Sequence, residues 1–296
     1  MLQNNEDFVV LKERIYSAII LVAFVLAALF LFDPFYFALT IGAAITLAIW
    51  EWTQFANVKQ PFWRFFIAGL FGSFLFLWIY SYKFDLNAGR VFVDYAELIL
   101  FMSVIWWAVA LIMVITFPAS IKLWQKSTFL QSIFALCTLI PFFIGALILR
   151  LNNYVMEPLH GVMLLLYVFI LVWAADSGAY FVGRKFGKTK LAPKVSPGKS
   201  WQGVFGGLIS AGILATIFVQ SMPEGTFQIS TTYFIALSIA TVAISILGDL
   251  TESMFKREAG IKDSSHLIPG HGGILDRIDS LTAAVPFFAY FYFYVL

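Results

Sequence analysis

The apolar runs of this sequence restrict its fold more than any other feature. A helix that crosses a bilayer needs about 20 mostly apolar residues, because its backbone polar groups must be satisfied inside the segment. Only 12% of the residues are charged, about half the share of a soluble domain. We therefore predict an all-α polytopic membrane protein with about nine transmembrane helices. The apolar runs lie at residues 15–32, 34–50, 65–81, 98–117, 129–149, 161–183, 203–221, 231–250 and 281–296.

The whole chain, residues 1–296, is interpreted as a single integral-membrane domain. The first apolar run is too long for a secretory signal, and acidic residues are mixed with Lys12 and Arg14 in front of it, so we expect it to be retained as a helix. No repeat or Gly/Ser-rich linker divides the sequence. Residues 1–150 receive no functional assignment, whereas residues 161–296 contain the candidate chemistry.

The basic residues are distributed unevenly between the two sides that nine spans define. Of the 19 lysines and arginines, only Lys83, Arg90 and Arg150 fall in loops on one side, and all the others fall on the opposite side. Cytoplasmic loops of membrane proteins are enriched in Lys and Arg. We therefore expect a cytosolic N-terminus, cytosolic basic loops, and a C-terminus on the opposite side.

The stretch VSPGKSWQGV, at residues 195–204, ends like a nucleotide-binding loop. Gly198, Lys199 and Ser200 match the end of a P-loop, but that loop needs a glycine where this chain has Pro193. Proline has no backbone N–H to offer a phosphate, and we do not expect a strand–loop–helix setting in so apolar a chain. Phosphate binding by another architecture stays open. The alternative is that the basic cluster at residues 184–199 only sets topology and attracts anionic lipid.

Two carboxylates occur inside apolar runs. Asp176 is the only charge in the sixth run, and Asp249 lies near the end of the eighth. An aspartate at the centre of a span costs roughly 2.5–3.5 kcal/mol on insertion scales, so such residues are often functional. The alternative for both is an interhelical hydrogen bond or a position at a helix end. Cys137, the only cysteine, excludes an intramolecular disulfide and a cysteine-based metal site.

The longest polar segment follows the eighth run, at residues 248–279. Asp276 and Asp279 stand three residues apart, so a helix that opens at Gly272-Gly273 would place both carboxylates on one face. Such a pair suits Mg²⁺, which commonly binds through one or two carboxylates and substrate phosphates. The alternative is a solvated loop with a salt-bridged helix start.

Other residues of this polar segment favour phosphate binding. Lysine and arginine neutralise phosphates, and glycines let the backbone approach a ligand closely. A lone histidine in a loop is more often a hydrogen-bonding residue than a catalyst. Beside a bilayer, this composition suggests a metal and phosphate site for lipid headgroups. The residues are Lys256, Arg257, Lys262, Gly270, His271, Gly272, Gly273 and Arg277.

Residues 253–279 resemble the signature of the integral-membrane phosphatidate cytidylyltransferases, or CDP-diacylglycerol synthases. That signature runs Ser-x-apolar-Lys-Arg, four residues, Lys-Asp, a short spacer, and then Pro-x-His-Gly-Gly-apolar-x-Asp-Arg-apolar-Asp. The matching positions here are Ser253, Lys256, Arg257, Lys262, Asp263, Pro269, His271, Gly272, Gly273, Asp276, Arg277 and Asp279.

Two upstream elements extend the resemblance over roughly the C-terminal 130 residues. ADSGAYFVGRKFGK, at residues 175–188, looks like the family's Asp-Ser/Thr-Gly-Ala-Tyr element, and SPGKSWQG looks like its Ser-Pro-Lys-Lys-Thr-x-Glu-Gly element. The second departs from the pattern, since Gly198 replaces a lysine and Gln202 a glutamate. Charge roles at these two positions are therefore not carried over.

The resemblance implies transfer of CMP from CTP to phosphatidate, which gives CDP-diacylglycerol and pyrophosphate for phospholipid biosynthesis. It implies a catalytic, metal-binding trio of Asp249, Asp276 and Asp279, with Mg²⁺ as the cofactor and a second cation left open. Lys256, Arg257 and Lys262 are the further catalytic candidates. The substrate-binding candidates are Asp176, Ser196, Lys199, Ser200, His271, Gly272, Gly273 and Arg277.

The same resemblance implies the partners and the location. The partners are CTP, phosphatidate in the membrane and a second copy of the chain in a homodimer; no nucleic acid is expected. The expected location is a cytoplasmic (inner) membrane, with the active site facing the cytoplasm. A CTP-dependent polyprenol or phytol kinase is one alternative. An ion-coupled transporter is another, with Asp176 as the coupling-ion residue.

Overall fold

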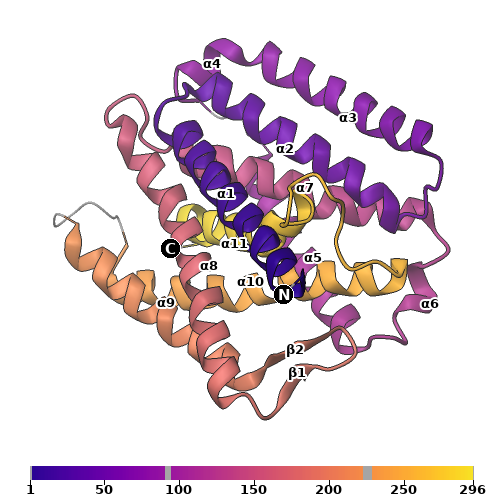
Figure 1. The fold of residues 1–296 in the computed structure, drawn as a ribbon. Coiled ribbons are helices and arrows are strands. Elements are labelled where there is room, and N and C mark those ends of the chain that lie inside the picture. Colours follow the sequence, from indigo (N-terminus) through magenta and orange to yellow (C-terminus); the bar gives the residue numbers. More distant parts are fainter. Residues whose placement is uncertain (1, 91–94, 223–228, 296) are drawn as a thin grey trace.

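A computed structural model describes residues 2–90, 95–222 and 229–295, with side chains from residue 14 onwards. Helices make up most of these residues (Figure 1). The N-terminal helices are α1 (Leu2–Phe30), α2 (Pro34–Phe55), α3 (Pro61–Ser81), α4 (Lys83–Asn87), α5 (Ala96–Ile115), α6 (Ile121–Trp124) and α7 (Thr128–Leu151). There follow α8 (Pro158–Phe186), β1 (Lys190–Ala192), β2 (Ser196–Ser200), α9 (Trp201–Ser221), α10 (Thr231–Ala259), α11 (Leu275–Tyr290) and the π-helical η1 (Phe291–Val295).

The predicted fold class, an all-α polytopic membrane protein, is confirmed. Within the described ranges, eight helices are long and apolar enough to cross a membrane: α2, α3, α5, α7, α8, α9, α10 and α11 with η1. The apolar part of α1, Arg14–Phe30, is shorter. Each of the nine apolar runs of the sequence therefore corresponds to a helix. The last span begins at Leu275, ahead of the predicted residue 281, and is 21 residues long.

The boundaries of these helices follow from residue chemistry. The side chains of Asp33, Ser127 and Ser230 accept hydrogen bonds from backbone N–H groups at the starts of α2, α7 and α10, which satisfies donors that lack a partner inside the helix. Helix α10 continues nine residues past the predicted apolar run and ends at Gly260, whose φ of 69° suits glycine. The first part of the polar segment is therefore helical.

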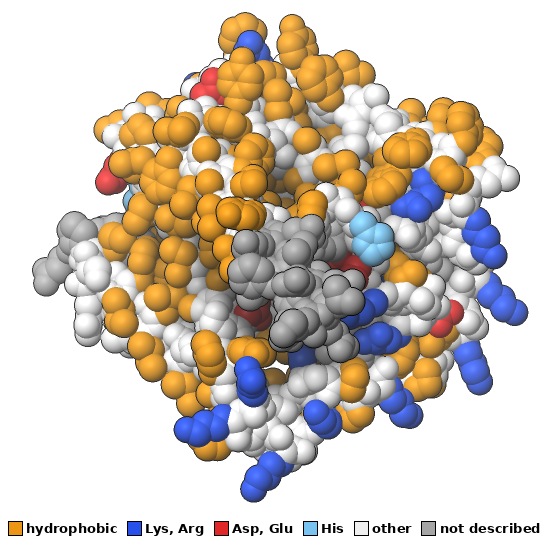
Figure 2. Space-filling model, viewed as in Figure 1, with side chains coloured by type: hydrophobic (Ala, Val, Ile, Leu, Met, Phe, Trp, Pro, Cys, Tyr) orange, Lys and Arg blue, Asp and Glu red, His pale blue; other side chains and the backbone are white. Residues whose placement is uncertain are grey.

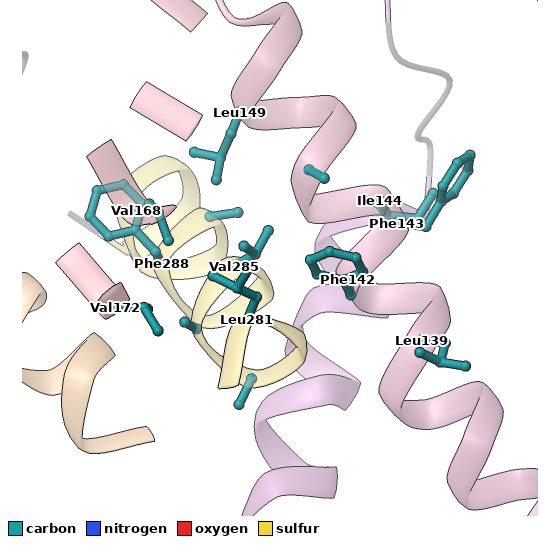
Figure 3. Packing of buried hydrophobic residues seen from close by; sticks show 14 of the residues in the cluster. Leu139, Phe142, Phe143, Ile144, Leu149, Val168, Val172, Leu281, Val285 and Phe288 are labelled. Carbon is teal, nitrogen blue, oxygen red and sulfur yellow. The ribbon is translucent and has the colours of Figure 1, made fainter. Parts of the chain in front are cut away.

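Helix α11 lies in the centre of the bundle, in contact with α5, α7, α8 and α10 (Figure 1). Helix α9 packs against α8 and α10, and α3 lies at the periphery against α2. Buried side chains of α7, α8 and α11 meet in the core (Figure 3). The central residues include Leu139, Phe142, Val168, Val172, Leu281, Val285 and Phe288. This packing holds the first turn of α11 beside α10 and α2.

The contacts of Arg150 explain why this basic residue lies on the side of the protein that has few lysines and arginines. The residue is 3% exposed, and its guanidinium donates to the carbonyl oxygens of Leu29 (3.1 Å) and Phe32 (3.3 Å). These carbonyls belong to the end of α1 and the turn after it, where backbone acceptors lack a partner within the helix. A cation is favoured at this helix end.

The loop predicted between α8 and α9 contains a two-stranded antiparallel hairpin, which corrects the sequence interpretation. Strands β1 and β2 pair Lys190 with Ser200 and Ala192 with Ser196. Strand β2 runs directly into α9, where the Ser200 hydroxyl accepts the N–H of Gly203 at 3.2 Å. A strand does precede a helix here, but no loop separates them, so the P-loop remains excluded.

Lysine and arginine side chains gather along the lower and right edges of the face in Figure 2, whereas apolar side chains cover most of its upper and left parts. The hairpin and the adjoining end of α8 lie at the lower edge (Figure 1). The exposed cations there are Arg184, Lys185, Lys188, Lys190 and Lys194. The basic cluster of the sequence thus forms one surface.

Candidate functional site

One face of α10 carries four polar side chains in succession. Asp249 is followed by Glu252 and Ser253, three and four residues later, and Lys256 follows these two by four and three residues, which places all four on one side of a helix. The hydroxyl of Ser253 donates to Asp249 at 3.2 Å. These residues can share one side only because α10 continues past its apolar run.

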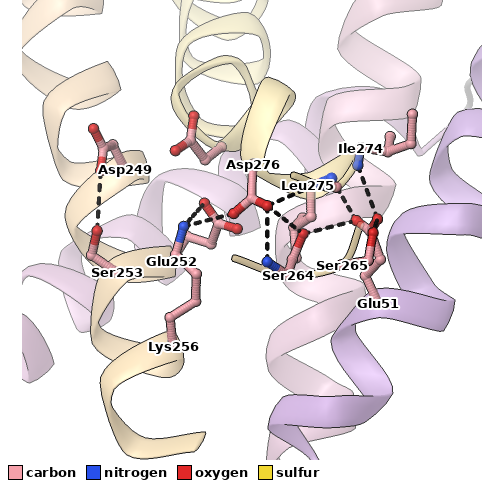
Figure 4. Close-up of polar contacts among 12 residues, drawn as sticks. Glu51, Asp249, Glu252, Ser253, Lys256, Ser264, Ser265, Ile274, Leu275 and Asp276 are labelled. Atoms are coloured by element: carbon pink, nitrogen blue, oxygen red, sulfur yellow. Dashed lines mark hydrogen bonds and ion pairs between the residues drawn. The ribbon is translucent and has the colours of Figure 1, made fainter. Parts of the chain in front are cut away.

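Lys256 joins this face of α10 to α11. Its ammonium lies 2.7 Å from an oxygen of Asp276 and 3.2 Å from Glu252 (Figure 4). The side chains of Asp276 and Glu252 are each only 4% exposed. Buried charges need partners of opposite sign and hydrogen bonds. Lys256 is therefore the counter-ion that allows two carboxylates to be buried together.

Asp276 is enclosed by donors from the protein itself. One carboxylate oxygen, Oδ1, accepts from Lys256, and the other, Oδ2, accepts the backbone N–H of Ser264 (2.8 Å), the Ser264 hydroxyl (2.9 Å) and the backbone N–H of Gly273 (2.8 Å). Four donors on one carboxylate fix its position. Asp276 therefore holds the loop between α10 and α11 against the first turn of α11.

The glycines before α11 are close to the protein's own carboxylates. A Cβ on Gly272, whose φ is +80°, would lie 2.6 Å from Asp276, and a Cβ on Gly273 would overlap Ser264 and Glu51. Only glycine fits both the positive φ and the close approach of the Asp276 carboxylate at position 272. The predicted opening of the helix at these glycines is wrong by two residues, because α11 begins at Leu275. Asp276 and Asp279 do lie on that one helix, as expected.

The three predicted metal-site carboxylates come from two neighbouring helices. Asp279 lies close enough to Asp249 and Glu252 for electrostatic interaction, and Asp249 forms an ion pair of 2.5 Å with Lys199. Asp276 is held instead by Lys256. Within residues 2–90, 95–222 and 229–295, no three His, Cys, Asp or Glu side chains stand close enough together to hold a metal ion. A shared metal site stays a prediction.

A cavity of 490 Å³ opens beside the hairpin. Its walls are α8, β2, α9 and α10, and the polar side chains in them include Asp176, Arg184, Lys199 and Asp249. We call it the basic cavity after Arg184 and Lys199, although the carboxylates of Asp176 and Asp249 balance these two charges within its lining. It brings together two of the sequence elements that resemble family motifs.

A second cavity, of 370 Å³, shares Asp176 with the first. Side chains of α1, α2, α7 and α8 make most of its wall apolar, and its polar end contains His271, Asp276, Arg277 and Asp279. We call it the apolar cavity. Asp176 lines both cavities, so it lies where the two compartments meet.

The remaining candidate residues differ in whether they line these two cavities. Ser200 lines the basic cavity but is 5% exposed and caps α9. Ser196, at the start of β2, and Lys262, exposed in the loop after α10, are not among the lining residues of the two cavities. Arg257 donates to the carbonyl of Val195 at 3.1 Å and so ties α10 to the hairpin.

His271 connects the loop before α11 to α1. Its Nδ1 lies 2.7 Å from the hydroxyl of Ser17. Partial burial, and after it the positive charges of Arg277 and Arg14, lower the pKa of His271, while a hydrogen bond with Pro269 opposes this. A pKa below the usual 6.5 makes the imidazole neutral at pH 7.

Sequence reasoning missed three residues of this site. Glu252 could have been found from its spacing, because it lies three residues after Asp249 and four before Lys256 on one helix. Glu51 falls at the end of the second apolar run, and Ser264 in the loop before α11. No local pattern signals that these two side chains meet across 213 residues of sequence.

The protein is therefore a polytopic membrane protein with a buried acid–base cluster close to the basic cavity and the apolar cavity. Residues 12–295 match the model of the cytidylyltransferase family, and the chain belongs to that family. It is 64% identical to a phosphatidate cytidylyltransferase of Haemophilus influenzae, over 97% of this chain and all of the relative. Proteins of the same description from Pseudomonas aeruginosa (43%) and Bacillus subtilis (32%) align over 94% of this chain and 96% of their own length.

Proposed function

We propose that this protein transfers CMP from CTP to phosphatidate and releases pyrophosphate, forming CDP-diacylglycerol for phospholipid biosynthesis. The observation that carries the proposal is the meeting of a basic and an apolar cavity at Asp176, next to the carboxylates of α10 and α11. A water-soluble polyanion and a lipid can approach one point from two sides. The relatives described as phosphatidate cytidylyltransferases support the same reaction.

The nucleotide occupies the basic cavity. Lys199 and Arg184 supply positive charge to the phosphates, and the surface cations of the hairpin raise the local concentration of a polyanion. In the structure Lys199 pairs with Asp249. A bound triphosphate takes over Lys199 and leaves the Asp249 carboxylate available for another positive ligand.

The lipid occupies the apolar cavity. Its acyl chains lie among the apolar side chains of α1, α2, α7 and α8, and its phosphate lies at the polar end, near Arg277. Acyl chains are favoured in this cavity for the same reason as in the bilayer, because their apolar surface is kept away from water. This orientation directs the lipid phosphate towards Asp176 and the basic cavity.

The chemistry is a direct attack by one phosphate on another. An oxygen of the lipid phosphate bonds to the α-phosphorus of CTP, while the bond from that phosphorus to the bridging oxygen of the β-phosphate breaks and pyrophosphate leaves with the electron pair. A phosphate monoester is largely ionised near neutral pH, so no protein nucleophile is needed. The protein positions the two substrates and offsets their charge.

The carboxylates of the site fit a hard divalent cation in kind. We assign Asp249, Asp276 and Asp279 as the residues that would hold Mg²⁺, with a second cation left open. Asp276 already accepts four hydrogen bonds, three at Oδ2 and one at Oδ1, so Oδ1 is the oxygen that would have a lone pair left for a cation. When bound, the cation would neutralise phosphate charge that the lysines and arginines of the site leave uncompensated.

One assay separates this function from its alternatives. Purified protein is incubated with CTP carrying a labelled α-phosphate and with phosphatidate, and in parallel with CTP carrying a labelled γ-phosphate and with a polyprenol or phytol. The proposal predicts a labelled CDP-lipid from the first mixture only. A phosphorylated lipid from the second mixture would identify a lipid kinase. If neither mixture gives labelled lipid and the protein, reconstituted in vesicles, takes up a solute together with an ion, it would be a transporter.

The site faces the cytoplasm of a bacterial inner membrane in this proposal, because CTP is a cytoplasmic substrate and the exposed cations flank the basic cavity. A homodimer is also expected from the family resemblance. Mass measurement of the detergent-solubilised protein by light scattering, with the detergent subtracted, tests the dimer.

A further inference from the structure

Glu51 is a fully buried carboxylate at the end of α2. It lies on the opposite side of Ser264 from Asp276 (Figure 4). Its Oε1 accepts the hydroxyl of Ser265 (2.6 Å) and the backbone N–H of Ile274 (2.9 Å), while its Oε2 accepts the hydroxyl of Ser264 (3.2 Å) and the backbone N–H of Leu275 (2.6 Å). All four donors belong to the loop before α11 or to its first residue.

These contacts make Glu51 a cap supplied to α11 by another helix. The N–H groups at the start of a helix have no acceptor within it, and negative charge is favoured there. Glu51 accepts the N–H groups of Ile274 and Leu275, while Asp276 accepts that of Gly273. Two carboxylates therefore divide three successive N–H groups between them.

Ser264 connects the two carboxylates. Its hydroxyl lies 2.9 Å from Asp276 Oδ2 and 3.2 Å from Glu51 Oε2. Because a hydroxyl has one proton to donate, the two carboxylates share this donor. The Gln54 side chain, one turn after Glu51 on α2, donates to the Ser264 carbonyl. A displacement of Glu51 therefore moves the donors that hold Asp276.

We propose that Glu51 is a positioning residue for the reaction. By fixing the first turn of α11 it sets the direction of Asp276, and of Asp279 one turn later, relative to Lys256 and Asp249 on α10. This inference rests on the proposed function. It makes α2, within the residues 1–150 that the sequence left without a function, part of the catalytic unit.

Glutamine at position 51 removes a defined part of this cap. Its amide has one acceptor oxygen and one NH₂ group. The hydroxyls of Ser264 and Ser265 can turn and accept from NH₂, but the N–H groups of Ile274 and Leu275 only donate. Since these two N–H groups bind different oxygens of Glu51, one of them loses its acceptor. Aspartate keeps the charge and both oxygens but is one methylene shorter.

The experiment compares the full-length wild type with Glu51→Gln, Glu51→Asp and the control Glu97→Gln, which removes an exposed carboxylate on α5. Steady-state formation of CDP-lipid gives kcat and the KM for CTP, and thermal unfolding is followed on the same samples. We expect kcat to fall about 10- to 100-fold in Glu51→Gln, as for other residues that orient a site. The KM for CTP stays near the wild-type value, because Glu51 does not line the basic cavity.

Stability and positioning give different results. A lower unfolding temperature with wild-type kcat, measured well below that temperature, would show that Glu51 acts only in folding and would overturn the inference. Partial recovery of kcat in Glu51→Asp supports positioning. If Glu51→Gln does not fold, Glu51→Asp decides, because its shorter side chain cannot keep all four contacts: unchanged kcat overturns the inference, and a reduced kcat at unchanged KM for CTP supports it. If the wild type forms no CDP-lipid, the proposed function itself fails.

Discussion

Replacement of Asp276 by asparagine tests the charge cluster that joins α10 to α11. Asparagine has nearly the same shape, but it carries no charge and has only one acceptor oxygen. If that oxygen takes the place of Oδ2, it keeps the three donors from Ser264 and Gly273. The new NH₂ group then faces the Lys256 ammonium, donor against donor, at a contact that measures 2.7 Å in the wild type.

The size of the effect follows from these contacts. A hydrogen bond to a charged group contributes about 1.5–3 kcal/mol and a neutral one about 0.5–1.5 kcal/mol. Removing one partner of a buried ion pair costs about 3–5 kcal/mol when the other charge is left alone. Lys256 is not left alone, because Glu252 remains at 3.2 Å. We therefore expect Asp276→Asn to lower the free energy of unfolding by about 3 kcal/mol and the activity by orders of magnitude.

The unfolding free energy is measured by denaturant titration in mixed micelles, for Asp276→Asn in the wild-type background and in a Lys256→Met background. The loss of unfolding free energy caused by Asp276→Asn should be clearly smaller in the Lys256→Met background, because the ion pair is already absent there before position 276 is changed. Asp85→Asn, in an exposed pair with Arg90 at 3.9 Å, is the control and should cost less than about 1 kcal/mol. Equal costs in both backgrounds would refute the assigned ion pair, and full activity at ordinary Mg²⁺ would refute the site.

Four further predictions concern the cavities, the metal and the topology. Lys199→Ala should raise the KM for CTP, whereas Ser200→Ala should also cost about 1 kcal/mol of stability through the lost helix cap; unchanged CTP kinetics in both would leave the hairpin a topological element. Asp176→Asn should reduce kcat, and normal activity would leave Asp176 a structural residue. Asp249→Asn and Asp279→Asn should each abolish most activity, and the double variant should be little worse, because residues that act as one unit are non-additive; simple addition of small effects would contradict a shared site. Reporter tags at the two chain ends should lie in opposite compartments, and same-side signals would contradict the nine-span topology.

Hydropathy predicted the membrane-spanning helices because each backbone hydrogen bond of a helix is made within four residues of sequence. The same local rule shows where the prediction stopped short. Helix α10 continues to Ala259 across a polar stretch, and hydropathy cannot report a helix that extends beyond the apolar layer. The hairpin after α8 was missed because its two strands are only three and five residues long and lack a strong alternating pattern.

The charged residues of this protein, and the helix ends near which they occur, could be predicted without the structure. Asp249, Lys256, Asp276 and Asp279 could be named in advance, because charged residues are rare in an apolar chain and several match a family signature. The partners of these residues could not be predicted in this way. Glu51 reaches the first turn of α11 across 224 residues of sequence. Such a contact depends on how α2, α10 and α11 pack together, and packing is a property of the whole bundle that no local stretch of sequence encodes.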